Sequence, residues 1–239
     1  MLDFMQVGQE ALEHEPGTRS EGALPVTLTQ APRVLATVGR RARNKADKQA
    51  RIFEAASELF TGMGYSAVTT QMVADRADVG TGTLFRYASS KAELLMMVMN
   101  EQMRLDTREG IAAASSGTSP TEAIMALLAP QIHLPMEFPE NTAVYQREIL
   151  FGTEMGQYRT EALARISELE EAIGDILGRF TLTHRVRQGV DLHGAARTTF
   201  STLHMELLRV TFGRGDPQTL TATLRSHVDV LLYGAFDRT

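Results

Sequence analysis

Residues 69–94, TTQMVADRADVGTGTLFRYASSKAEL, carry the strongest structural signal in this 239-residue chain. A threonine at the start of the stretch can cap a short helix that runs through Ala77, and residues 78–81 form a tight turn. A second short helix is expected from about Thr81 to Tyr87, with Leu84 pointing inward. The pattern therefore predicts two short helices that meet across a turn.

A longer helix is expected just before this pair. Apolar residues recur with helical spacing between Ile52 and Phe60, and Gly62 and Gly64 then stop the pattern. Two short helices packed on a preceding longer one form a helix-turn-helix, whose second short helix enters the DNA major groove. An ordinary helical hairpin with capping hydroxyls is the alternative that the spacing leaves open.

The second short helix carries a small and polar outer surface, as close approach to base edges requires. Helix N-termini attract phosphate through their free N–H groups, and a nearby phenol adds a donor. The predicted DNA contacts in this region are Thr69, Thr70, Thr81, Gly82, Thr83, Arg86, Tyr87 and Lys91.

Positive charge gathers in the same region, although the whole chain has a net charge of −5. Residues 40–100 hold nine basic and six acidic side chains, and four of the basic ones lie between Arg40 and Lys45. Such a patch is typical of a nucleic-acid interface, whereas a solvated charged face is the alternative on charge alone. We expect Arg41 and Arg43 to contact phosphate or the minor groove nonspecifically.

Everything downstream of Lys91 is predicted to be helical. A long helix continues from Lys91 towards Ala114, and further helices are expected over 120–132, 141–151, 157–180, 191–212 and 217–236. No stretch has a convincing strand pattern. The predicted fold class is all-α, with an N-terminal three-helix unit that contains the helix-turn-helix, followed by a larger helical bundle. The last two helices are unusually apolar, which suits a subunit interface.

Composition limits the remaining classes of protein. The chain has no cysteine, its longest apolar runs are far shorter than a membrane helix of about 20 residues, and its N-terminus is acidic. These features favour a cytoplasmic protein that does not span a membrane. Residues 1–39 contain Pro16, Pro25 and Pro32 and lack helical periodicity, so we expect them to be disordered.

The stretch from Thr69 to Leu94 resembles the N-terminal helix-turn-helix signature of the TetR family of regulators. The matching positions are Thr69, Val73-Ala74, Ala77-Asp78-Val79, Gly82-Thr83-Leu84-Phe85, Tyr87, Lys91 and Leu94. The stretch from Ile52 to Tyr65 is similar to the first helix of the family. The resemblance covers roughly residues 48–95 and therefore only the DNA-binding part of the chain.

The resemblance implies a homodimer in which a small-molecule effector controls binding to a double-stranded DNA operator. Together with the composition of the N-terminus, it gives three expected parts: a disordered, basic-ended arm (1–43), a helix-turn-helix domain (44–90) and a domain for ligand binding and dimerisation (91–239). The last two helices would form the dimer, and the helix from Lys91 would be the only continuous rigid link between the domains. The expected function is a repressor that a small apolar effector releases from a palindromic operator.

The residues that could line the implied ligand pocket are apolar or aromatic, although packing in the core is the alternative for each of them. The candidates are Met99, Met103, Tyr145, Phe151 and Tyr158.

Three residues depart from the family pattern. Asp78 replaces a glycine in the turn, where aspartate tolerates a left-handed backbone better than most residues. Phe85 stands where a tyrosine often contacts phosphate, and could contact a thymine methyl group instead. Ala88 replaces an aromatic residue, which would weaken packing between the third and fourth helices.

The sequence contains no arrangement of residues typical of an enzyme. The glycines of residues 80–85 lack the spacing of a dinucleotide loop, and His193 and His204 lack partners at metal-ligand spacing. We therefore expect no catalytic residues, no metal and no cofactor. The alternative to a regulator is a helical adaptor that keeps the fold but binds another protein, and salt-dependent DNA affinity distinguishes the two.

Overall fold

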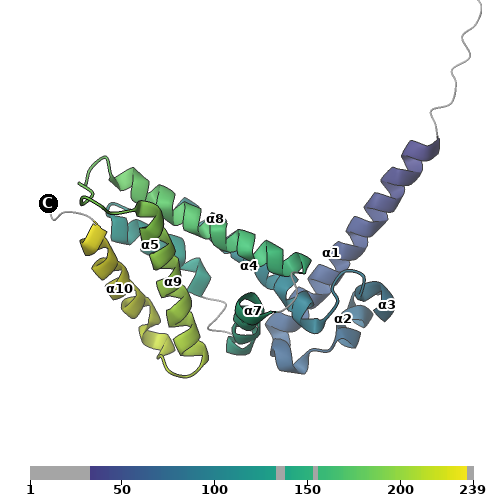
Figure 1. The fold of residues 1–239 in the computed structure, drawn as a ribbon. Coiled ribbons are helices and arrows are strands. Elements are labelled where there is room, and N and C mark those ends of the chain that lie inside the picture. The colour runs from purple at the N-terminus through teal and green to yellow at the C-terminus, as the bar shows by residue number, and fades with distance from the viewer. Residues whose placement is uncertain (1–32, 133–137, 153–155, 236–239) are drawn as a thin grey trace, which may run out of the picture. The chain divides into compact units, whose positions relative to one another are not determined.

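The computed structural model describes residues 33–132, 138–152 and 156–235, and the chain divides into two compact units, residues 1–40 and 41–239. Its helices are α1 (Arg33–Ala67), α2 (Thr70–Arg76), α3 (Thr81–Leu84), α4 (Lys91–Ala114), α5 (Pro120–Leu128), α7 (Pro139–Phe151), α8 (Gln157–Phe180), α9 (Leu192–Thr211), η1 (Pro217–Thr219) and α10 (Leu220–Ala235) (Figure 1). The described residues contain no β-strand. The all-α prediction is therefore confirmed, and the expected spans of α4 and α8 match the observed ones.

The first helix differs from its prediction at both ends. It begins at Arg33 rather than near Ala50, so residues 33–43, which we expected in a disordered arm, are helical. Pro32 directly precedes the helix, and the arginines, alanines and lysines that follow are good helix formers. At the other end the chain continues past Gly64, where φ is 75° and the helix kinks. The expected disorder of residues 1–32 lies outside the described residues.

The helix-turn-helix follows its sequence signals closely. Thr69 caps α2, because its side chain accepts a hydrogen bond from the Met72 N–H at 3.2 Å. Asp78 adopts a left-handed conformation with φ of 50°, as expected for the turn. Leu84 is fully buried, so α3 packs its one large apolar side chain inward. Ala88 is also buried, and it fits where the family more often has an aromatic residue.

Two apolar cores hold residues 41–239 together. The first lies under the helix-turn-helix, where Ile52, Phe60, Val73 and Leu84 pack with the first half of α4 and with parts of α7 and α8. The second joins the end of α4 to α5, α8, α9 and α10, with α8 packed against both α4 and α9 (Figure 1). Because α4 contributes to both cores, it connects them rigidly. Among the described helices, none combines the length and the apolar character needed to cross a membrane.

Candidate nucleic-acid interface and internal pocket

A basic cleft lies between α1 and the segment that follows α3. It has a volume of about 420 Å³ and is lined by Arg41, Asn44, Lys45, Lys48, Arg86 and Tyr87. The four residues from α1 follow helical spacing and so share one face of that helix. The Tyr87 hydroxyl donates to the Lys45 carbonyl at 3.2 Å, which ties the two sides of the cleft together.

The cleft adds residues that the sequence did not single out. Asn44 and Lys48 line it together with Arg41, whereas Arg43 does not. Their shared face follows from helical spacing, but only if the helix begins before Arg41. Because residues 1–43 were predicted to be disordered, the helical spacing of these residues was not recognised.

The polar residues of α2 and α3 are partly bonded to one another. Thr81 donates to the Gln71 side-chain carbonyl at 2.9 Å, and Arg86 donates to the Thr83 hydroxyl at 3.3 Å. Gly82 and Phe85 are exposed, the latter by 45%. These bonds fix the side chains of the short helix before any partner arrives. Gln71 was not among the predicted contacts, although it is exposed on α2 and holds Thr81 in place.

Lys91 is more firmly held than a phosphate-binding lysine on a free surface. Its ammonium donates to the Tyr65 carbonyl at 2.9 Å and to the Val68 carbonyl at 2.8 Å. It also lies 4.1 Å from the centroid of the Tyr65 ring. Two of its three N–H groups therefore secure the end of α1 to the start of α4, and one is left for another acceptor.

Asp78 has an electrostatic partner that the sequence did not indicate. One guanidinium nitrogen of Arg51 donates to the Asp78 carboxylate at 3.1 Å and to its carbonyl at 3.3 Å. The pair joins α1 to the turn between α2 and α3. It also compensates the negative charge of the Asp78 carboxylate.

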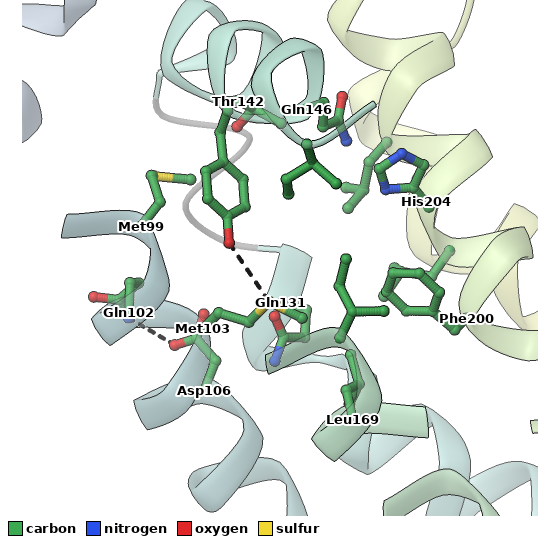
Figure 2. A pocket seen from close by; sticks show the side chains of 15 residues that line it. Met99, Gln102, Met103, Asp106, Gln131, Thr142, Gln146, Leu169, Phe200 and His204 are labelled. Carbon is green, nitrogen blue, oxygen red and sulfur yellow. Dashed lines mark hydrogen bonds between the residues drawn. The ribbon is translucent and has the colours of Figure 1, made fainter. Parts of the chain in front are cut away.

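A second cavity lies inside the bundle formed by α4, α7, α8 and α9 (Figure 2). Its volume is about 80 Å³, and most of its wall is apolar. Met99, Met103 and Tyr145 line it, as the sequence suggested for a pocket. Phe151 does not, because it is 75% exposed. Tyr158 is buried in the other core, where its hydroxyl contacts the Met97 sulfur at 3.2 Å.

Three polar atoms in this pocket have no hydrogen-bond partner among the described residues. They are Thr142 Oγ1 and Gln146 Oε1 on α7 and His204 Nε2 on α9. Burial lowers the pKa of the His204 imidazole, which favours its neutral form. Buried polar atoms usually find partners, so three in one cavity mark it as a candidate binding site.

Helix α7 connects this pocket to the helix-turn-helix unit. In its first turn the Asn141 amide donates to the Phe60 carbonyl at 3.0 Å, and the Glu140 carboxylate accepts from the Ser66 N–H at 3.1 Å. One turn later, the Tyr145 hydroxyl donates to the Asn100 side-chain carbonyl at 2.8 Å. Hydrogen bonds from α7 therefore join the two parts in addition to the continuous helix α4.

The outer face of α9 and α10 is partly apolar. A groove of about 400 Å³ between the two helices is lined by residues that include Met205, Val230 and Leu231. Met205 and Val230 are 52% and 68% exposed, whereas Leu224 is fully buried in the bundle. The expected seam is thus smaller than the apolar content of these helices suggested, because many of their leucines face the core.

Comparison with known proteins agrees with this geometry. Residues 52–97 match the family model of bacterial regulatory proteins, tetR family. The chain is 26% identical over 163 residues to the HTH-type transcriptional repressor KstR of Mycobacterium tuberculosis, covering 68% of this chain and 71% of that protein. It is 38% identical over 73 residues to KstR of Mycolicibacterium smegmatis, covering 30% of this chain and 36% of that protein.

A solved structure shares the fold. FadR of Thermus thermophilus, a TetR family transcriptional repressor crystallised with lauroyl-CoA, superposes with a TM-score of 0.63 at 22% identity. The match covers 80% of this chain and 96% of that one. The protein is thus an all-helical transcription regulator with an N-terminal helix-turn-helix. More particularly, the match over residues 52–97 confirms its resemblance to the TetR family.

Proposed function

We propose that this protein is a homodimeric repressor that binds a palindromic operator and is released from it by a small, largely apolar effector. The observation that carries the DNA-binding part is the basic cleft next to α3. Arg41, Lys45 and Lys48 extend from α1 towards the same cleft as Arg86. Cations placed in this way bind phosphate on either side of a helix that reads base edges.

The DNA contacts then divide into two kinds. Arg86, Thr83, Thr81, Gly82 and Phe85 lie on or directly after α3 and would meet base edges. Arg41, Arg43, Thr69, Thr70, Tyr87 and Lys91 would hold phosphate. Since the Lys91 ammonium already bonds two carbonyls, its role is first to support the helix-turn-helix and only second to contact DNA.

The functional division that we propose follows the expected boundaries, with residues 1–43 as an accessory arm, 44–90 for DNA and 91–239 for ligand and dimer. The effector site is the cavity that Met99, Met103 and Tyr145 line. That FadR was crystallised with lauroyl-CoA supports a lipid-like effector. A protein that acts on DNA in this way would work in the cytoplasm.

Effector binding would reach the DNA-binding unit through two helices. The pocket wall includes Met99 and Met103 of α4 and Tyr145 of α7, and α7 bonds the end of α1 through Glu140 and Asn141. A ligand that prefers one arrangement of α7 would shift the position of α1 and α3, and DNA would weaken ligand binding by the same factor.

Selection of bound fragments from a random DNA library tests the proposal. We expect an inverted repeat, because a two-fold protein dimer requires a two-fold site. Affinity for the selected site should fall steeply with salt. Recovery of no preferred sequence, with no salt-dependent DNA affinity, would contradict the proposal and favour the protein-binding adaptor.

A further inference from the structure

The unpartnered polar atoms gather at one end of the internal pocket. Thr142 and Gln146 are four residues apart on α7 and therefore share a face, and His204 reaches the same space from α9. Figure 2 shows these three side chains at one end of the pocket, away from Gln102, Asp106 and Gln131 at the other. Both Thr142 and Gln146 are more than nine-tenths buried.

The polar groups at the other end already have partners. Gln102 donates to the Asp106 carboxylate at 2.6 Å, and Gln131 donates to the Thr107 hydroxyl at 3.1 Å. The two ends of the pocket therefore differ in what they offer to a ligand. Among the described lining residues, the buried polar atoms without a partner all lie at the end formed by Thr142, Gln146 and His204.

The chemistry of these three groups selects the kind of ligand atom. A threonine hydroxyl donates and accepts, a glutamine amide offers a carbonyl and an NH₂ group, and a neutral imidazole nitrogen does either according to its tautomer. Among the described lining residues there is no arginine or lysine, and Asp106 is the one carboxylate. An anionic ligand would therefore meet no cationic side chain in the described lining, and an ammonium at the unpartnered end would lie away from Asp106.

We propose that this pocket binds an uncharged, largely apolar molecule whose hydroxyl or carbonyl oxygen lies among Thr142, Gln146 and His204. The effect of this molecule on DNA binding rests on the proposed function, whereas the binding of the molecule to the pocket does not. The volume of about 80 Å³ is roughly half the 150 Å³ of an engineered apolar cavity that holds benzene. A ligand of six or more heavy atoms therefore needs Met99 or Met103 to move, which flexible thioether chains allow.

The test compares four six-carbon molecules that carry different polar groups: 1-hexanol, 2-hexanone, hexanoate and hexylammonium. Their affinities for the full-length protein without DNA are measured by ligand-observed NMR titration. We expect 1-hexanol and 2-hexanone to bind at least ten times more tightly than hexanoate and hexylammonium. Preference for either charged molecule, or failure of both neutral ones to bind, would overturn the proposal.

Two matched variants locate the oxygen. Gln146→Leu should lower the affinity for 1-hexanol at least tenfold, because it removes the amide whose oxygen has no partner. Gln131→Leu makes the same change in the same pocket, but its amide already bonds Thr107, so the affinity should stay within threefold. Equal effects of both changes would refute the placement. If Gln146→Leu does not fold, the ranking of the four molecules on the natural protein decides.

Operator affinity with and without 1-hexanol separates the two proposals. If 1-hexanol binds as expected but leaves operator affinity unchanged, the ligand class is supported and the proposed release by effector is refuted. If hexanoate binds preferentially and changes operator affinity, the ligand class is refuted and the repressor function is supported.

Discussion

Asp78 adopts the left-handed backbone conformation that the turn requires and also supplies a charged partner for Arg51. Its φ of 50° suits glycine, asparagine or aspartate, and its carboxylate pairs with Arg51. Since the carboxylate is 96% exposed, the ion pair itself contributes little to stability. The left-handed backbone conformation therefore matters more to the stability of the turn than the ion pair does.

Substitution at Asp78 should accordingly depend on backbone tolerance. Asp78→Gly is expected to leave the free energy of unfolding within about 0.5 kcal/mol, whereas Asp78→Ala should cost roughly 1–2 kcal/mol. Urea denaturation measures both, with Asp47→Ala at an exposed helical position as the control. Equal losses for the glycine and alanine variants would show that the ion pair matters more than the backbone.

Arg86 and Lys48 are cations in one cleft with different expected roles. Arg86→Ala should reduce the sequence preference at about one base position and weaken the free energy of operator binding by roughly 1–3 kcal/mol. Lys48→Ala should weaken operator and random DNA equally and lower the salt slope by about one. Affinity measured against salt on both DNAs checks this pair. An equal loss on both DNAs for Arg86→Ala would argue against base readout.

The half-buried imidazole of His204 should make stability depend on pH. Its pKa in the folded state is lowered from 6.5 by burial, so below about pH 6.5 the unfolded chain binds more protons than the folded one. The stabilisation is fully present above that pH and declines as the pH falls towards the folded-state pKa.

Thermal unfolding between pH 5 and pH 8 tests this dependence. The His204→Leu variant should lose less stability between pH 7 and pH 5 than the natural protein does. The change His193→Leu, at an exposed position on the same helix, serves as the control and should leave the profile unaltered. Parallel profiles for the natural protein and the His204 variant would exclude this residue as the source.

Helix α7, like α4 with its Lys91, joins the pocket to the DNA-binding unit by hydrogen bonds. Its first turn bonds Phe60 and Ser66, and the residues that follow line the cavity. Helix α4 also spans both cores, but its long apolar packing makes it a rigid connection. We expect α7 to carry much of the coupling, whose usual scale is about 1–3 kcal/mol.

Asn141→Ala should uncouple the two sites. It removes the bond to the Phe60 carbonyl at 3.0 Å without touching the cavity wall. Effector affinity without DNA should stay within about threefold, while the effect of effector on operator affinity should shrink by several-fold. Calorimetry with and without operator measures both. Glu148→Gln near the other end of α7 is the control, and an undiminished response in the Asn141 variant would assign the coupling to α4.

For the assembled molecule, we expect α9 and α10 to supply the surface for dimer formation. Leu224 of α10 is fully buried, so a charge there would unfold the bundle. Val230 and Met205 are exposed beside the groove and are the better choice.

Val230→Glu should therefore give a folded monomer that binds the operator poorly, because each half-site loses the support of the other. Analytical ultracentrifugation and circular dichroism report the mass and the helix content. Leu182→Glu, at a residue that is 88% exposed and lies beyond α8, should leave the dimer intact. If the Val230 variant stays dimeric, the dimer interface lies elsewhere on the molecule.

Features that depend on neighbours along the chain were predictable from the amino-acid sequence. They include a threonine cap at the start of α2, the left-handed turn at Asp78 and the spans of α4 and α8, because helix signals act over a few residues. The early start of α1 was missed, since charged helix formers without an apolar stripe resemble a polar arm.

Contacts between residues far apart in the chain became known from the three-dimensional fold alone. It placed Tyr145 on the cavity and Tyr158 in the other core, although both are aromatic residues on nearby helices. It also brought Thr142, Gln146 and His204 to one end of a pocket. An amphipathic pattern shows which face of a helix is buried but not which helix covers it, and for that reason these contacts could not be predicted.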